Sequence, residues 1–133
     1  MIDYQVGQKA FFEKCITDED IRSFATISGD DNPIHLNDEY AGNSIFGRRI
    51  AHGILVSGLI SKVIGTQLPG EGTIYLSQSL KFLKPVYVDE TVRAEVEVKE
   101  IQTEKNRMLL DTRIYRQNGE CVLCGEALVM PPH

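Results

Sequence analysis

The segment GILVSGLISKVIGTQ, residues 53–67, limits the possible folds of this chain more than any other part of it. It contains one charged residue, Lys62, and its apolar residues fall on nearly every side of a helix. A surface helix has a polar face, whereas a helix that is apolar all round is covered by its surroundings. Pro69 and Gly70 predict where this helix ends. The remaining chain must therefore form a structure that surrounds one central helix.

Regular alternation of apolar and charged residues predicts that this surrounding structure is a β-sheet. The apolar residues at positions 92, 94, 96 and 98 alternate with charged ones, which gives a strand one dry and one wet face. An Asn-Gly pair at residues 118–119 separates two further apolar runs and is a strong signal for a β-hairpin. The strands predicted in this way cover residues 9–16, 73–88 with an interruption at Pro85, 92–99, 107–116 and 121–130.

This order of elements predicts the α+β class, with an antiparallel sheet wrapped around one long helix. One strand precedes the helix, and we expect the four strands after it to pair as an antiparallel meander. Such a sheet has one dry face, which the apolar helix covers. A chain of 133 residues is long enough for one domain with one hydrophobic core, and we expect no second domain.

Charge and composition argue against several partners and cofactors. The formal net charge of -5 at pH 7 opposes binding to nucleic acid. No apolar run is long enough to span a membrane, and the N-terminus lacks a basic leader and an apolar signal region, so we expect no membrane contact and a cytoplasmic location. Cys121 and Cys124 fall on opposite faces of a predicted strand and cannot bind one metal from the same side. We expect neither a metal nor a dinucleotide, since G-x-G-x-x-G is absent.

The stretch SGDDNPIH, residues 28–35, follows a short predicted helix and has two interpretations. Thr17, followed by three acidic residues, is a typical helix N-cap, and Gly29 has the usual place of a glycine after a helix. Asp and Asn side chains bond their own backbone, and Pro33 extends the residue before it, which predicts a structural turn. Alternatively, Asp30 and His35 meet in one cavity as an acid/base pair. The residue types alone leave both interpretations open.

A longer stretch around these residues resembles a known family. Residues 24–35, FATISGDDNPIH, with Ala41 six residues later, are similar to the hydratase motif of MaoC-like proteins, the (R)-specific enoyl-CoA hydratases. The similarity continues through residues 51–55, 68–70 and 74–82, and the length resembles that of the short single-domain members. The resemblance implies one MaoC-like hot-dog domain over residues 1–133, and a homodimer whose sheets join edge to edge.

The resemblance also implies roles for residues on both sides of the predicted turn. It places the catalytic pair on Asp30 and His35, and the residue that helps hold the loop on Asn32. It places the oxyanion donor, a backbone N–H, on Gly53 and a polar active-site serine on Ser61. A backbone donor at the positive end of a buried helix is well placed to stabilise an enolate-like transition state. Ser61 has a second interpretation as a helix serine that bonds back to a carbonyl group.

Three further residues are candidates for contacts with the substrate. Ile64, one helical turn beyond Ser61, is a candidate for limiting acyl-chain length, with a core residue as its alternative interpretation. Arg48 and Arg49 are candidates for binding the phosphates of CoA, and solvated surface charge is the alternative for them. CoA would then be part of the substrate, and no separate cofactor is expected.

The activity that the resemblance implies is reversible (R)-specific hydration of trans-2-enoyl-CoA to (R)-3-hydroxyacyl-CoA. The alternative is a dehydratase that acts on (R)-3-hydroxyacyl chains, on CoA or on acyl carrier protein, with the same residues. A hot-dog thioesterase is less favoured because residues 53–67 contain neither Asp nor Glu. A serine esterase is disfavoured because no G-x-S-x-G elbow is present. Fatty acid metabolism and polyhydroxyalkanoate synthesis both remain open as settings.

Overall fold

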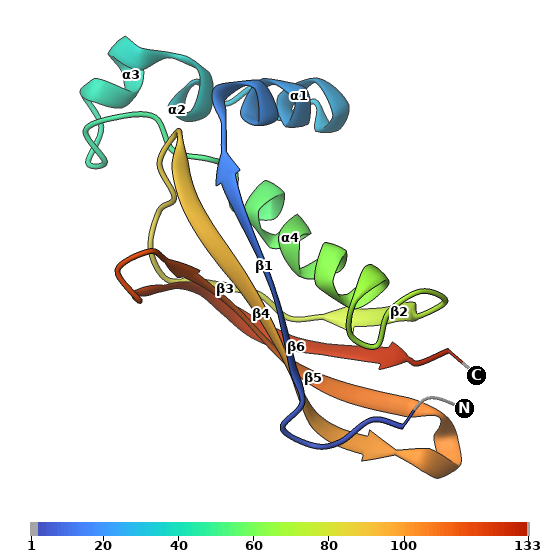
Figure 1. The fold of residues 1–133 in the computed structure, drawn as a ribbon. Coiled ribbons are helices and arrows are strands. Elements are labelled where there is room, and N and C mark those ends of the chain that lie inside the picture. Colours follow the sequence, from blue (N-terminus) through green and yellow to red (C-terminus); the bar gives the residue numbers. More distant parts are fainter. Residues whose placement is uncertain (1–2, 133) are drawn as a thin grey trace.

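The computed structural model describes residues 3–132, which form one antiparallel sheet with a long helix, α4, along one of its faces (Figure 1). Three short helices, α1 to α3, lie together at one end of the sheet. The strands are β1 (Lys9–Ile16), β2 (Ile74–Gln78), β3 (Lys81–Phe82), β4 (Glu90–Gln102), β5 (Arg107–Arg116) and β6 (Cys121–Met130). The helices are α1 (Asp18–Ser28), α2 (Pro33–Leu36), α3 (Asp38–Gly42) and α4 (Gly53–Thr66), with a 3-10 turn at Thr103–Lys105.

The pairing of the strands confirms part of the predicted topology and corrects the rest. Within the described residues the order is β1-β4-β5-β6-β2, and β3 also pairs with β6. The predicted meander is therefore right for β4, β5 and β6 but wrong for β2 and β3, which pair with β6 instead of β4. The reason is that β1 pairs antiparallel with β4, from Lys9 opposite Glu97 to Ile16 opposite Glu90. With β4 already paired on both sides, the chain that leaves α4 joins the sheet at β6.

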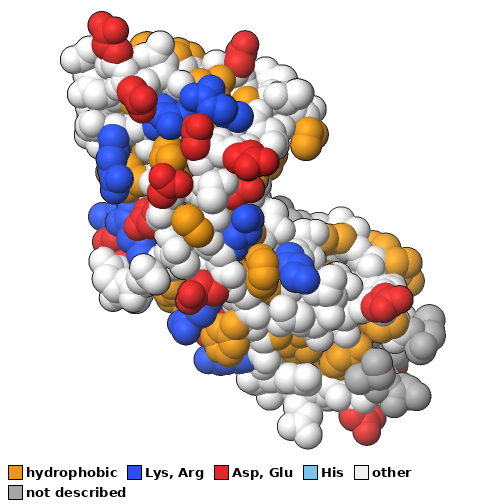
Figure 2. Space-filling model, turned by 45° about the horizontal axis from the view of Figure 1, so that its top comes forward, with side chains coloured by type: hydrophobic (Ala, Val, Ile, Leu, Met, Phe, Trp, Pro, Cys, Tyr) orange, Lys and Arg blue, Asp and Glu red, His pale blue; other side chains and the backbone are white. Residues whose placement is uncertain are grey.

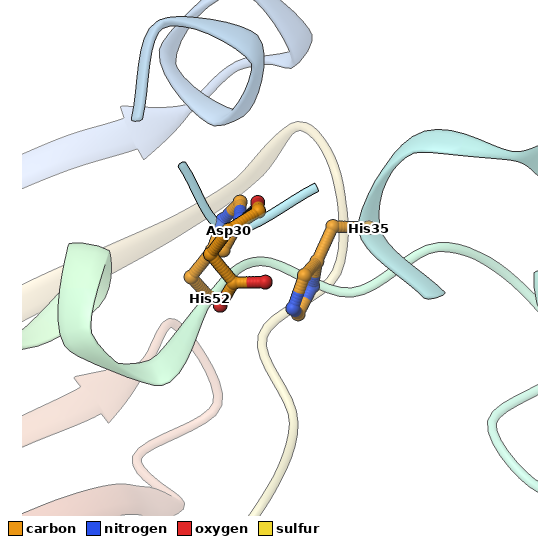
Figure 3. A group of neighbouring side chains, drawn as sticks. All are labelled: Asp30, His35 and His52. Carbon is orange, nitrogen blue, oxygen red and sulfur yellow. Dashed lines mark hydrogen bonds between the residues drawn. The ribbon is translucent and has the colours of Figure 1, made fainter. Parts of the chain in front are cut away.

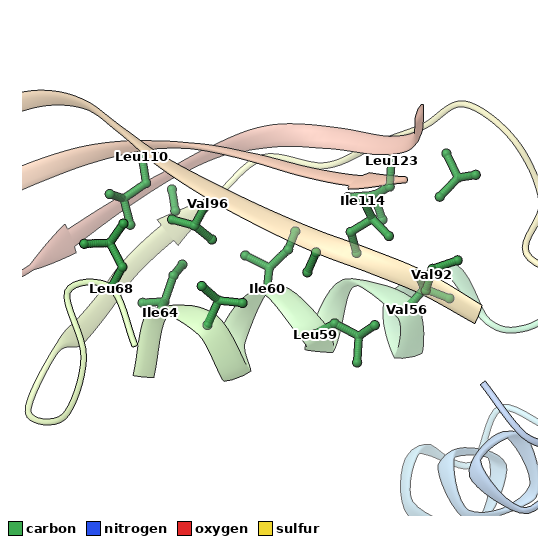
Figure 4. Packing of buried hydrophobic residues seen from close by; sticks show 14 of the residues in the cluster. Val56, Leu59, Ile60, Ile64, Leu68, Val92, Val96, Leu110, Ile114 and Leu123 are labelled. Atoms are coloured by element: carbon green, nitrogen blue, oxygen red, sulfur yellow. The ribbon is translucent and has the colours of Figure 1, made fainter. Parts of the chain in front are cut away.

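The core lies between α4 and the sheet. Five residues on one face of the helix are 7% exposed or less, and they pack against side chains of β4, β5 and β6 (Figure 4). Full burial of a side chain of this size stabilises a fold by roughly 1.5–3 kcal/mol, so this face contributes much of the stability. The buried residues of the helix are Val56, Leu59, Ile60, Val63 and Ile64.

The opposite face of α4 is exposed, which differs from the expected complete cover. Ile54 is 56% exposed, and Gly58, Ser61 and Gly65 are also exposed. A single sheet has one dry face and covers only the side of a helix that it touches. One copy of this chain therefore leaves an apolar and small-residue surface on its central helix uncovered.

Helix α1 has the ends that the sequence predicts. The Thr17 hydroxyl accepts a hydrogen bond from the Asp20 N–H at 3.1 Å, and the Asp20 carboxylate accepts one from the Thr17 N–H at 3.0 Å. The helix ends at Gly29, which has a φ of 80°. A positive φ of this kind is easily adopted by glycine, so Gly29 turns the chain toward α2.

Within the described residues no helix combines the length and apolar character needed to cross a membrane.

Candidate active site

The segment between α1 and α2 is a turn that the side chains of the same segment hold. The Asp30 carboxylate accepts a hydrogen bond from the Asn32 N–H at 3.2 Å. The Asn32 side chain accepts one from the Ile34 N–H at 3.1 Å and caps α2, whose first residue is Pro33. Proline suits the first turn of a helix because its missing N–H would have no partner there. The resulting single helical turn carries His35, so the segment is both a turn and a candidate site.

His35 is 8% exposed, and its environment determines which ring nitrogen is available. Its Nδ1 lies 2.8 Å from the carbonyl oxygen of Ile50. A carbonyl oxygen only accepts hydrogen bonds, so Nδ1 carries the hydrogen and Nε2 of the neutral ring has a free lone pair. Burial lowers the pKa of His35 below its ordinary value, which outweighs the hydrogen bond to Ile50 that raises it. His35 is therefore a neutral proton acceptor near pH 7.

Asp30 supplies the second acceptor. Asp30 is exposed, and its carboxylate points toward the His35 ring (Figure 3). Candidate ligand atoms of Asp30, His35 and His52 all lie within 4.8 Å of one another. This separation allows one water molecule to bridge the carboxylate and the imidazole. The structure thus brings together the two residues that the motif marked as a catalytic pair.

His52 is a third member of this group that the sequence reasoning did not single out. It is 2% exposed, its Nε2 lies 3.0 Å from the carbonyl oxygen of Asp30, and its ring stacks on His35 with 3.8 Å between centroids. The signal was its position immediately before the central helix, where Ser, Thr, Asp or Asn is the usual cap. His52 occupies that position but makes no side-chain cap bond.

The arrangement of the three side chains favours an acid/base pair over a metal centre. The His35 and His52 rings stack, with 3.8 Å between centroids and 29° between their planes. Metal ligands must converge on the ion. In addition, one nitrogen of each ring lies within hydrogen-bond distance of a backbone carbonyl oxygen. This arrangement fits an acid/base pair with a supporting ring.

An apolar cavity of about 390 Å³ lies beside the pair. His35 and Gly53 both line it, so the acceptor nitrogen and the beginning of α4 are next to the same space. The first N–H groups of a helix have no intrahelical acceptor, which leaves the Gly53 N–H free to bind a ligand oxygen. The other lining residues are Phe46, Ile50, Ala51, Ile54, Val56, Phe82, Leu83, Lys84, Pro85, Val86, Val122 and Leu123.

Gly53 lies in close contact with the ring of Phe82. A Cβ atom at this position would lie 2.5 Å from Cε1 of the Phe82 ring, which is closer than two non-bonded carbon atoms can approach. The ring of Phe82, on β3, therefore rests directly on the backbone at the start of α4. Any larger residue at position 53 would displace this wall of the cavity.

The structure does not bring Ser61 or Ile64 to this cavity. Ser61 follows Gly53 by eight residues, which places it about 12 Å further along the helix axis and about 80° around it. It lies on the exposed face of α4. Ile64 is 1% exposed and packs in the core, as its alternative interpretation states. Neither residue lines the cavity of the single chain.

The two candidate arginines have different environments. The Arg49 guanidinium lies 2.6 Å from a carboxylate oxygen of Asp18 and 2.8 Å from one of Asp38, and it donates to the His35 carbonyl at 3.2 Å. With these partners and a side chain only 10% exposed, Arg49 is a weaker candidate for a phosphate contact than Arg48. Arg48 is exposed and stacks on the Tyr87 ring at 4.1 Å, which leaves it as the candidate.

The sheet and its helix define this chain as a hot-dog fold protein, with an Asp/His pair at the N-terminal end of the central helix. The sequence profile of the "MaoC like domain" family matches residues 4–116. The chain therefore belongs to the MaoC-like family.

Two relatives and one solved structure extend this comparison. The chain is 44% identical over 128 residues to an (R)-specific enoyl-CoA hydratase of Aeromonas caviae, covering 96% of each protein. It is 45% identical over 130 residues to a 3-hydroxybutyryl-CoA dehydratase of Methylorubrum extorquens, covering 98% of this chain and 82% of the relative. The solved structure of an (R)-hydratase from A. caviae involved in PHA biosynthesis superimposes with a TM-score of 0.95, at 44% identity, over 97% of this chain and 98% of the other.

Proposed function

We propose that this protein catalyses the reversible (R)-specific hydration of trans-2-enoyl-CoA to (R)-3-hydroxyacyl-CoA. The observation that carries the proposal is an Asp/His pair beside a cavity that the first residue of α4 also lines. The side chains of Asp30 and His35 lie within 4.8 Å of each other, and His35 and Gly53 both line the cavity. Relatives named as a hydratase and as a dehydratase support the same chemistry in its two directions.

Two acceptors beside one cavity suit the activation of one water molecule. The water donates one hydrogen bond to His35 Nε2 and one to the Asp30 carboxylate, so its lone pair faces the substrate. Its oxygen forms a bond to C3 of the enoyl group while one of its protons passes to the pair. The pair then delivers a proton to C2 from the same side. The elements of water are thereby added syn. Because they add to only one face of the double bond, a single enantiomer of the product forms.

The beginning of α4 suits the negative charge that develops on the thioester. Addition at C3 moves an electron pair of the double bond toward the carbonyl group, which gives its oxygen the character of an enolate. The Gly53 N–H at the positive end of the helix can donate to that oxygen. One donor of this kind typically contributes on the order of 3 kcal/mol to the stability of the transition state.

The same groups also catalyse the reverse reaction, loss of water from a 3-hydroxyacyl thioester. A catalyst accelerates the forward and reverse reactions by the same factor. The dehydratase name of a 45% identical relative favours this second candidate. No metal or separate cofactor enters either reaction, and CoA is part of the substrate. Arg48 is the proposed contact for a CoA phosphate, because its guanidinium is exposed and pairs with no carboxylate among the described residues.

We further propose that the protein acts as a homodimer. Strand β2 is an edge of the sheet within the described residues, and Ile74, Tyr75 and Leu76 on it are 55%, 39% and 43% exposed. Hydrophobic side chains gather on the part of the surface toward the C-terminus, whereas charged side chains crowd the end formed by α1 to α3 (Figure 2). An exposed apolar edge strand is a template for pairing with another strand. A second copy would cover this edge.

The activity is tested by mixing the protein with crotonyl-CoA and following loss of the absorbance of the conjugated thioester. The product is then offered to an (R)-specific and an (S)-specific 3-hydroxyacyl-CoA dehydrogenase, and we expect oxidation only by the first. Release of free CoA thiol without loss of the double bond would instead indicate a thioesterase. Unchanged enoyl-CoA across short and medium chains would refute the proposal.

A further inference from the structure

His52 is a buried polar residue to which the proposed reaction assigns no step. It is 2% exposed, and it does not line the cavity, although its neighbours Ala51 and Gly53 do. With only 2% of its surface exposed, His52 offers little area to a substrate. A buried polar side chain is explained by its partners, and those of His52 belong to the site.

The first partner is the backbone of Asp30. The Nε2 atom of His52 lies 3.0 Å from the Asp30 carbonyl oxygen, and since that oxygen only accepts, Nε2 carries a hydrogen and donates it. The N–H of Asp30 donates to the Ser28 hydroxyl at 3.0 Å. Asp30 lies in an exposed turn, so these two bonds fix its backbone from both ends. The direction of the catalytic carboxylate depends on that backbone.

The second partner is the His35 ring. The two imidazoles stack at 3.8 Å, and the Phe24 ring contacts His52 at 4.7 Å between centroids. Stacking restricts rotation of His35 about the bonds of its side chain, while the bond from Nδ1 to Ile50 fixes the ring in its plane. His52 thereby helps to keep the Nε2 lone pair of His35 directed at the site.

The third link is through the chain itself. His52 is the N-cap residue of α4, and its carbonyl oxygen accepts a hydrogen bond from the Val56 N–H at 3.1 Å. The peptide that follows His52 carries the Gly53 N–H. A displacement of His52 therefore also moves the proposed oxyanion donor.

The remaining nitrogen of His52 argues against a purely structural role. Nδ1 is buried and has no hydrogen-bond partner among the described residues. An unsatisfied buried nitrogen destabilises a fold, and an aromatic hydrocarbon ring of similar size would avoid it. The one side-chain hydrogen bond of His52 within the described part of the chain is therefore the one to Asp30, and it explains why this position holds an imidazole.

We infer that His52 is a positioning residue, which holds the Asp30 carboxylate, the His35 imidazole and the first N–H of α4 in one arrangement. It does so without touching the substrate. The inference rests on the proposed function, because the arrangement matters only if those groups act together. Misplacement of reacting groups by about 1 Å typically lowers a rate on the order of 100-fold.

Two substitutions separate the hydrogen bond from the ring. His52→Phe keeps a flat ring against His35 but removes the donor to Asp30, whereas His52→Gln keeps an amide N–H at similar reach and removes the ring. For His52→Phe we expect kcat for crotonyl-CoA to fall roughly 10-fold to 100-fold, with KM changed by less than about 3-fold, since binding is intact and positioning is lost. We expect His52→Gln to recover part of the loss, because it restores the donor to Asp30 but not the ring against His35.

A spectroscopic measurement accompanies the kinetics. The carbonyl ¹³C resonance of Asp30 reports its hydrogen bond, so it should shift in His52→Phe and stay near the wild-type position in His52→Gln. Circular dichroism confirms that both variants are folded. An inactive wild-type enzyme would refute the proposed function and this inference with it. An active wild type whose two variants match it in kcat, or lose kcat equally with an unshifted carbonyl, would overturn the role of His52 alone.

Discussion

At the scale of single residues, the chemistry depends on the ring nitrogen of His35 that remains free. The Ile50 carbonyl occupies Nδ1 at 2.8 Å, which leaves Nε2 as the acceptor. Burial of the ring, followed by the effect of the neighbouring His52, lowers the pKa of His35. The groups that face His35 are the carboxylate of Asp30, the His52 ring and the Arg49 guanidinium, which donates to its backbone carbonyl. Burial and His52 outweigh the Ile50 hydrogen bond and the Asp30 carboxylate, both of which raise the pKa of His35, so the neutral acceptor form prevails at neutral pH.

The lowered pKa of His35 predicts the acid limb of the pH profile. Activity requires the neutral ring, and a lowered pKa extends the neutral form to more acidic solution. We therefore expect kcat/KM for crotonyl-CoA to fall only at pH values below the ordinary histidine pKa of about 6.5. Measurement of kcat/KM from pH 8 downward, with circular dichroism as a check on folding, tests this. A half-maximal point above the ordinary value would contradict it.

Replacement by alanine is expected to have different effects at the two neighbouring arginines, on stability at Arg49 and on substrate binding at Arg48. Arg49 connects α1, α3 and the His35 carbonyl, so Arg49→Ala should lower the free energy of unfolding by about 1–2 kcal/mol, given that the Asp18 side chain is 43% exposed and the Asp38 side chain 90% exposed. Arg48→Ala should leave stability unchanged and raise KM for enoyl-CoA several-fold. Urea unfolding and steady-state kinetics on both variants test the pair. The reverse pattern would return Arg49 to the list of phosphate contacts.

The motif residues show which parts of the site could be predicted from the sequence. Asp30, Asn32 and His35 lie within one local turn, so their common position follows from neighbouring residues. The ion pairs of Arg49 could not be predicted in this way, because Asp18 precedes it by 31 positions and only the folded chain brings the two together. The role of His52 could not be predicted from local sequence, because its partners, Asp30 and His35, also belong to another segment.

At the scale of elements, local patterns predicted strand and helix positions well. The strands at residues 9–16, 107–116 and 121–130 match β1, β5 and β6, and the alternating residues of β4 are buried as expected. The predicted strand at 73–88 instead forms the two short strands β2 and β3. The choice of strand partner is a long-range property, which explains why the position of β1 beside β4 was not foreseen.

The break between β2 and β3 predicts a strict requirement for glycine in β6. A Cβ atom at Gly125 would lie 1.8 Å from the Ser79 carbonyl oxygen, which belongs to the backbone between the two strands. Gly125→Ala should therefore lower the free energy of unfolding by about 2 kcal/mol or more. Gly42→Ala is the matched control, because nothing lies within 4 Å of its added Cβ. Equal stability of the two variants in urea would show that the backbone at Ser79 moves freely.

At the scale of the whole molecule, the exposed face of α4 and the edge at β2 support the proposed dimer. We expect the wild-type protein to sediment as a dimer at micromolar concentration. Leu76→Lys should shift it toward the monomer, because a charge on an edge strand opposes pairing with a second strand. Analytical ultracentrifugation of both proteins tests this. A wild type that sediments as a monomer throughout would contradict the proposal.

The central claim is that Asp30, and not the adjacent Asp31, acts with His35 on one water molecule. The most direct test is kcat for hydration of crotonyl-CoA by Asp30→Asn and Asp31→Asn, two variants with the same chemical change one residue apart. We predict that kcat falls roughly 100-fold to 10,000-fold in Asp30→Asn, the range of general acid/base catalysis, and stays within about 3-fold of wild type in Asp31→Asn. Equal losses in the two variants, or an active Asp30→Asn, would contradict this account.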